Sequence, residues 1–165
     1  MDKKKSACCF IGHRVVPNAI YSDIAYQTEC KVFDYISQGF IDFYVGGLTG
    51  YDLIASLAVI NAKRIFPHAR LNLVLPLEDQ VAKAKKHDND IHEKILSNAD
   101  HIEYVSEHCK KVSKDINSHQ LVDCSSMCIC YLYDDIDDTA SKVEYTKKEG
   151  LRVINVAEEK EWIRL

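Results

Sequence analysis

Short apolar segments alternate with helical segments along the whole chain, and this order restricts the fold more than any other feature. The expected strands cover residues 7–11, 40–45, 71–75, 101–105, 126–133 and 151–156. The first of them, Ala-Cys-Cys-Phe-Ile, is apolar throughout, which is typical of a strand buried on both faces. Strands separated by helices in this way predict an α/β fold, a doubly wound, mainly parallel Rossmann-like sheet of about six strands with helices on both faces.

The segments between the strands predict the helices and a single domain. Helical patterns cover residues 19–38, 50–66, 79–97, 109–122 and 139–149. Gly39 and Gly150 stand where helices commonly end, and Pro67 stops the second helix. Because there is no internal repeat, low-complexity tract or linker, we expect one domain over residues 1–165, long enough to bury a core without metals or cross-links.

Charge and hydropathy exclude some partners. The formal net charge is −4, and proteins that bind duplex DNA usually present a strongly basic face, so nucleic acid is not the expected partner. No apolar run approaches the roughly 18 residues that a membrane span requires. The apolar run after the basic start ends at Gly12, which is too short for a secretory signal. We therefore expect a cytoplasmic protein without a membrane partner.

The chain has seven cysteines, an odd number that cannot pair completely. Cys8, Cys9, Cys128 and Cys130 lie in apolar runs, which predicts buried, reduced thiols in a reducing compartment. The alternative is a metal site at Cys124, Cys128 and Cys130. Because no Cys-x-x-Cys pair is present and two of these residues fall in an expected strand, we predict no metal.

Gly-His-Arg at residues 12–14 directly follows the first expected strand. In an open parallel sheet, ligands bind beyond the carboxyl ends of the strands. Gly12 allows close approach of the backbone, Arg14 can hold a phosphate or carboxylate with two hydrogen bonds, and His13 can donate a hydrogen bond or transfer a proton. The alternative is an ordinary turn with a surface arginine and a packed histidine.

A second candidate lies after the strand at 40–45, where Gly-Gly-Leu-Thr-Gly-Tyr-Asp runs from Gly46 to Asp52 and leads into a helix. Glycine amides and a helix N-terminus together form an anion site. The segment is neither a Walker loop nor a Gly-x-Gly-x-x-Gly motif. Thr49 and Asp52 also have the spacing of a capping box, so Asp52 alternatively caps the helix.

The third candidate is the acidic segment from Asp134 to Asp138, followed by Thr139, after the strand at 126–133. Its carboxylates could bind a divalent cation, although the spacing matches no EF-hand loop. We favour a solvated acidic loop that supplies the N-cap of the next helix.

Several of these segments also resemble a known family. The shared pieces are Ile11 to Arg14, Gly46 to Asp52, Pro76-x-x-x-Gln80, Ala99-Asp100 and Val122-Asp123-x-Ser125, spread between about Cys8 and Val156. In their order and spacing they resemble the DUF1273/YpsA-like proteins of the SLOG superfamily, which also includes the LOG phosphoribohydrolases and DprA. The resemblance implies a Rossmann-like sheet that binds nucleotide-like ligands.

The chain also departs from that family pattern. Ile11 replaces the usual threonine, Asn117-Ser118-His119 stands where Arg-Asn-Arg is common, and Asp137-Asp138-Thr139 stands where Gly-Gly-Thr is common. The LOG motif Pro-Gly-Gly-x-Gly-Thr-x-x-Glu is absent, so hydrolysis of the LOG type is not expected.

Together these observations predict binding or sensing of a phosphate-bearing small molecule, a nucleotide or nucleotide derivative, without a resident cofactor. The first alternative is a nucleotide N-glycosidic hydrolase in which Arg14 holds the phosphate and Asp52 or Glu144 assists at the ribose. The second is a DprA-like module for nucleic acid or protein interaction. Self-association is left open. The candidate ligand-binding residues are Gly12, His13, Arg14, Gly46, Gly47, Thr49, Gly50, Asp52, Pro76, Gln80, His119, Asp123 and Thr139.

Overall fold

The computed structural model describes residues 3–76, 89–105, 113–135 and 137–159. Its centre is one parallel sheet with the strand order β4-β3-β2-β1-β5-β6. The strands are β1 (Ala7–Gly12), β2 (Asp42–Val45), β3 (Arg70–Leu75), β4 (His101–Tyr104), β5 (Met127–Tyr131) and β6 (Arg152–Asn155). The expected Rossmann-like α/β fold is thereby confirmed.

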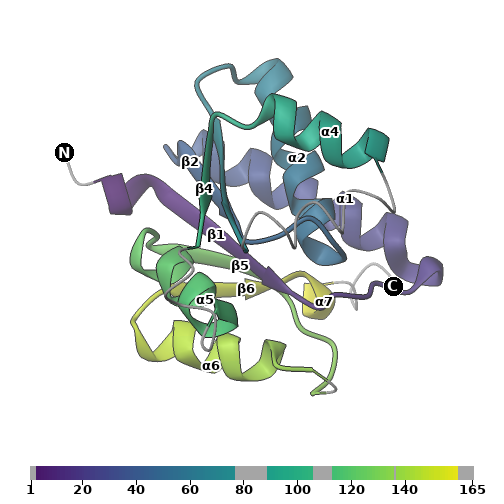
Figure 1. Ribbon diagram of the computed structural model, residues 1–165, viewed down its shortest axis with the longest axis vertical. Helices are drawn as coiled ribbons and strands as arrows, with labels where there is room; N and C mark the ends of the chain where they lie inside the picture. Colours follow the sequence, from purple (N-terminus) through teal and green to yellow (C-terminus); the bar gives the residue numbers. More distant parts are fainter. Residues whose placement is uncertain (1–2, 77–88, 106–112, 136, 160–165) are drawn as a thin grey trace.

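Helices cover both faces of the sheet (Figure 1). One layer holds α1 (Asn18–Ser37), α2 (Tyr51–Ile65) and α4 (Asn89–Asn98), and the other holds α5 (Ser113–Asp123) and α6 (Thr139–Lys148). A 3-10 turn at Lys3–Ser6 (η1) precedes the first strand, and a short helix α7 (Val156–Glu159) follows the last. Neither of these two was predicted from the sequence. None of the helices in the described parts of the chain combines the length and the hydropathy that a membrane span requires.

Two hydrophobic cores lie on the two faces of the sheet, and β1 contributes to both. Cys8 and Phe10 pack with residues of α1 and α2, whereas Cys9 and Ile11 pack with residues of α5 and α6. This alternation explains why β1 reads as a continuous apolar run, because both faces of a central strand are buried. Each fully buried large side chain contributes roughly 1.5–3 kcal/mol.

The buried cysteines of the central strands are unpaired thiols. Cys8, Cys9, Cys128 and Cys130 are buried in β1 and β5, as expected, and none forms a disulfide. Burial raises the pKa of the Cys130 thiol to about 12. No group of three or more His, Cys, Asp or Glu residues in the described parts of the chain is arranged to hold a metal ion.

The ends of some elements differ from the sequence expectation. The expected helix at 79–97 is described only as α4, since residues 77–88 lie outside the described part. The fifth strand ends at Tyr131 instead of residue 133. The Asn155 side chain binds the backbone N–H and C=O of Leu132, and the N–H of Tyr133 is bound by a side chain, so the chain leaves the ladder there.

The direction of the strand order reverses between β1 and β5. From β1 the chain builds outward through β2, β3 and β4, and then crosses to the other side of β1 to form β5 and β6. The carboxyl ends of β1 and β2 lie at one edge, so Gly12 and Gly46 share that edge. This reversal is where open α/β sheets bind ligands.

Gly12 is required by packing at this edge. A Cβ atom there would overlap the Cβ, Cγ and Cδ2 atoms of the fully buried Tyr51. Substitution Gly12→Ala should therefore lower the free energy of unfolding by about 2 kcal/mol, the usual size of an overpacking penalty. Denaturant unfolding of the purified protein measures this.

Gly47→Ala is the matched control. A Cβ at Gly47 would meet only the mobile end of a side chain, Oδ2 of Asp52 at 2.8 Å, which can rotate away. Its cost should stay below about 1 kcal/mol, within the range of a mild substitution. Equal losses for the two variants would contradict the packing explanation.

Candidate functional site

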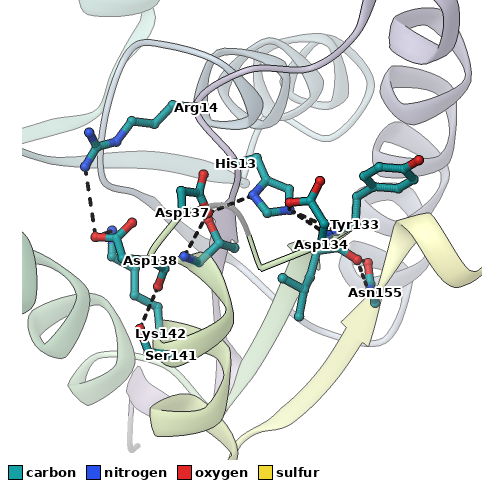
Figure 2. Close-up of polar contacts among 11 residues, drawn as sticks. His13, Arg14, Tyr133, Asp134, Asp137, Asp138, Ser141, Lys142 and Asn155 are labelled. Carbon is teal, nitrogen blue, oxygen red and sulfur yellow. Dashed lines mark hydrogen bonds and ion pairs between the residues drawn. The ribbon is translucent and has the colours of Figure 1, made fainter.

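Three loops meet where the strand order reverses. They are the turn after β1 with His13 and Arg14, the glycine loop between β2 and α2, and the acidic loop between β5 and α6. Figure 2 shows the first and third of these loops facing each other, with His13 and Arg14 directed toward the acidic side chains. The fold thus brings together all three segments singled out in the sequence.

His13 joins the turn after β1 to the loop after β5. Its ring is buried and packs edge-on against Tyr131. Nδ1 lies 2.9 Å from Oδ1 of Asp137, and Nε2 accepts the backbone N–H of Tyr133 at 2.9 Å (Figure 2). Because Nε2 accepts a hydrogen bond, Nδ1 carries the ring proton and donates a hydrogen bond to Asp137. Both ring nitrogens are therefore occupied by the protein itself in this conformation.

Asp137 is the acceptor on which this loop is built. Its Oδ1 also accepts the backbone N–H of Thr139 at 3.0 Å. Partial burial by itself would raise the pKa of Asp137, but the hydrogen bonds from Thr139 and His13 outweigh it and lower the pKa to about 2. Asp137 is thus ionised at neutral pH, and it binds the first amide of α6 in the manner of a helix cap.

Arg14 and Lys142 lie on either side of Asp138. The Arg14 Nη2 atom is 4.0 Å from Oδ2 of Asp138, and the Lys142 Nζ atom is 3.6 Å from the same oxygen (Figure 2). Asp138 is the N-cap residue of α6, as the sequence suggested for this loop, but its side chain makes no capping hydrogen bond. Its carboxylate faces the two cations instead.

The glycine loop is packed against the turn after β1. Gly50 has φ +58°, and a side chain there would overlap the backbone carbonyl of Arg14. The N–H of Tyr51 donates to the carbonyl of His13 at 3.0 Å. Gly12 and Gly50 therefore let two backbone segments and the Tyr51 ring fit together, a structural requirement in addition to the ligand contact expected from the sequence.

Asp52 lies in the first turn of α2, beside Gly47. Gly50 is the N-cap of this helix and has no side-chain capping bond, so the expected capping box between Thr49 and Asp52 is not formed. The backbone of Gly50 passes close to that of Arg14 with a positive φ, a conformation that favours glycine at the N-cap. Burial raises the pKa of Asp52 from 3.8 to about 7, although Lys142 and Arg14 oppose the shift.

Of the other candidates, Asp123 is placed away from this cluster, near the amino edge of the sheet. Asp123 is the last residue of α5. Three residues later the chain reaches the amino edge of the sheet, where the N–H of Ser126 donates to the carbonyl of Ala7.

His119 stacks on Tyr145 with ring centroids 4.0 Å apart. Glu144 is exposed on α6. Pro76 follows β3 and is partly buried, and Gln80 lies outside the described residues.

Thr139 is buried, and its side chain forms a hydrogen bond with Asp137 instead of facing solvent.

A shallow pocket of about 80 Å³ lies between α5 and α6. It is lined by Ser118, His119, Ser141, Lys142 and Tyr145. Lys142 belongs to both this pocket and the cluster around Asp138, and it was not singled out in the sequence. Its position four residues after Asp138 on a helix was the available signal.

Asp100, part of the family resemblance, has a structural role. Its backbone N–H donates to the Leu71 carbonyl at 2.8 Å, and its Oδ2 accepts the Leu71 N–H at 2.8 Å. The residue therefore joins the start of β4 to the start of β3. This is the amino edge, opposite the candidate site.

Removing the charge of Asp52 should stabilise the protein at neutral pH. The folded-state pKa of about 7 lies above the ordinary value of 3.8, so the folded chain holds a proton that the unfolded chain has lost between these values. The native protein is therefore expected to lose stability as the pH rises from about 4 to about 7. The free energy of unfolding of Asp52→Asn should exceed that of the native chain by about 2 kcal/mol at pH 8 and by almost nothing at pH 4. The value at pH 8 is smaller than the full pKa shift implies, because the side chain keeps some contact with solvent.

Urea unfolding of both proteins at several pH values measures this difference. Asp90→Asn is the control, because Asp90 is an exposed residue in the first turn of α4. The control should stay within about 0.5 kcal/mol of the native chain. A pH-independent difference for Asp52→Asn would contradict the raised pKa.

Comparisons with known proteins agree with this fold. The YspA SLOG family model matches residues 18–158, a range that begins after His13 and Arg14. No curated protein matches the chain.

Among solved structures, the X-ray structure of DNA processing protein A (DprA) from Streptococcus pneumoniae is similar, with a TM-score of 0.63 and 14% sequence identity. The likeness covers 92% of this chain and 50% of that chain, so the chain spans half the length of that protein. At this identity the likeness shows a common fold. Because the family match extends over most of the chain, the protein belongs to the YspA SLOG family.

Proposed function

We propose that the protein binds a phosphate-bearing small molecule, a nucleotide or nucleotide derivative. The binding site lies at the carboxyl ends of β1 and β5, where the strand order reverses. The observation that carries this proposal is the grouping of Arg14, Lys142 and the carboxyl of Asp52, whose pKa of about 7 both cations influence. A carboxyl with so large a shift, beside two cations at this edge, is typical of a binding site rather than of a solvated surface.

The backbone adds to the attraction for an anion. α2 begins beside the glycine loop and α6 begins at the acidic loop, so the N-termini of both helices lie at this edge. Helix N-termini carry partial positive charge that favours phosphate. The first amides of these two helices, those of Tyr51 and Thr139, are already bound by His13 and Asp137, so the contribution here is that of charge. Arg14, whose side chain is 54% exposed, is free to reorient and form two hydrogen bonds with phosphate oxygens.

The remaining polar groups suit the sugar of a nucleotide. When protonated, Asp52 can donate a hydrogen bond to a ribose hydroxyl or a phosphate oxygen, and Thr49 is exposed on the same loop. Membership of the SLOG family supports a nucleotide-like ligand. The unpaired buried thiols suit a reducing compartment, and we propose that the protein works in the cytoplasm.

A nucleoside phosphate should raise the melting temperature of the protein. At a concentration about 100 times its dissociation constant it adds roughly 2.7 kcal/mol, equivalent to roughly 5–10 °C for a domain of this size. Arg14→Ala should remove most of this shift, because the variant lacks the two-point donor for phosphate. Thermal unfolding across a panel of nucleoside mono-, di- and triphosphates and dinucleotides measures it.

Arg152→Ala is the matched control, since Arg152 is an exposed arginine that begins β6 at the opposite edge of the sheet. The control should keep the full ligand shift. Unchanged melting curves of the native protein across the whole panel at millimolar concentration would refute the proposal.

The pKa of Asp52 also favours a second candidate function, hydrolysis of the N-glycosidic bond of a nucleotide. A general acid or base works best when its pKa lies near the working pH, and that of Asp52 is about 7. The other acid considered for this role, Glu144, is exposed on α6 and has no described contact with Arg14 or Asp52. His13 has both ring nitrogens engaged.

We therefore expect binding without turnover. Incubation of the protein with nucleoside monophosphates, NAD and ADP-ribose, followed by chromatography, should release no free base or ribose phosphate above the rate without protein. Turnover that falls by about 10²-fold or more in Asp52→Asn would establish the hydrolase instead. Asp90→Asn serves as control, because that carboxylate lies on a different helix.

A further inference from the structure

We propose that the Asp138 carboxylate occupies the phosphate position between Arg14 and Lys142 in the unliganded protein, and that a ligand must displace it. This inference rests on the proposed function and adds a mode of regulation to the same site. The binding site then carries its own competing anion, supplied by the loop after β5.

The position of the carboxylate is the first argument. Oδ2 of Asp138 lies 4.0 Å from Nη2 of Arg14 and 3.6 Å from Nζ of Lys142, two cations that come from different elements (Figure 2). One carboxylate oxygen thus faces both cations, as a phosphate oxygen would. Without Asp138, no other described carboxylate of the acidic loop is paired with both Arg14 and Lys142. The other acid that both cations influence is Asp52, whose pKa of about 7 leaves it only partly ionised at neutral pH.

The second argument is that Asp138 does not perform the task its position suggests. An aspartate at an N-cap normally binds an amide of the first turn. Here the N-cap side chain makes no such bond, and Asp137 binds the Thr139 amide in its place. The side chain of Asp138 is therefore held by charge alone, and its rotation would leave the helix cap intact.

The third argument is that these contacts are weak enough to be exchanged. The Asp138 side chain is 38% exposed and that of Arg14 is 54% exposed. Exposed ion pairs at such distances contribute little each. A phosphate monoester carries about −1.5 to −2 charges at pH 7 and three acceptor oxygens, so it can replace a single carboxylate.

The neighbouring Asp137 would remain in place during this exchange. Its carboxylate is tied to His13 and Thr139 by hydrogen bonds at 2.9 Å and 3.0 Å. The two adjacent acids therefore have different roles: Asp137 fixes the loop, and Asp138 can move. Opening the site requires a change of one side-chain rotamer and no change of the backbone.

The test compares the native protein with Asp138→Asn and Asp135→Asn by isothermal titration calorimetry, using inorganic pyrophosphate and adenosine 5′-monophosphate as probes. Asparagine is as good an N-cap as aspartate, so the first variant should fold. Asp135 is an exposed acid of the same loop, and its variant removes the same charge without touching Arg14 or Lys142. We expect Asp138→Asn to bind both probes about tenfold more tightly than the native protein, and Asp135→Asn to stay within about twofold.

A double-variant cycle tests the route of the effect. In an Arg14→Ala background, Asp138→Asn should improve binding by much less than tenfold, because the cation it releases is missing. An undiminished gain in that background would overturn the inference. Asp138→Ser, which also keeps a good N-cap, should reproduce the gain of Asp138→Asn.

The outcomes separate the inference from the proposed function. If the native protein binds the probes and Asp138→Asn binds them equally or more weakly, the competing carboxylate is refuted while the binding site stands. If neither the native protein nor Asp138→Asn binds any probe, the proposed function fails, and the inference fails with it.

Discussion

β1 packs between two helical layers, and this packing positions the neighbouring strands and the loops that follow them. This strand has a paired neighbour on each side, β2 and β5, and its side chains enter both cores. A strand in this position needs apolar residues on both faces, and its parallel neighbours place all carboxyl ends at one edge. The polar residues that follow β1 are therefore delivered to the point where the strand order reverses.

The candidate site at this edge is held by a few buried hydrogen bonds, and it contains one carboxyl group whose ionised form destabilises the fold. His13 is buried with a partner for each ring nitrogen, which lets a polar side chain bridge two loops without an unpaired donor or acceptor. Asp52 differs, since burial raises its pKa to about 7 and its ionised form opposes folding. Chains retain such groups where binding or catalysis needs them.

Much of the architecture could be predicted from the sequence because it follows from local patterns. The strands are apolar runs, and the order of strands and helices leaves few topologies open. The ends of the elements were less predictable. At the end of β5, the side chain of Asn155 takes the hydrogen bonds of the Leu132 backbone that a neighbouring strand would otherwise make. Ile65, the apolar last residue of α2, is 65% exposed because the helix ends there, at the amino edge of the sheet.

The candidate site was predicted in its segments but not in the roles of its residues. Gly12, Gly50 and Asp52 were candidate ligand-binding residues, and the fold shows that both glycines serve packing against Tyr51 and the turn after β1. Lys142 was not among the candidates, because its spacing of four residues from Asp138 is common on helix surfaces and indicates no site by itself. Its importance comes from sharing Asp138 with Arg14, a residue distant in sequence.

Local sequence patterns are sufficient to predict the α/β class, the parallel sheet, the buried thiols of the central strands and the three polar segments at strand ends. These properties depend on side chains that are near neighbours along the chain, whose periodicity is set by helix and strand geometry. The hydrogen bond between His13 and Asp137, the position of Asp138 between two cations and the raised pKa of Asp52 depend on the folded arrangement of distant segments. Distances between loops and the loss of solvent around a charge arise only when strands far apart in sequence become neighbours, and no local pattern encodes them.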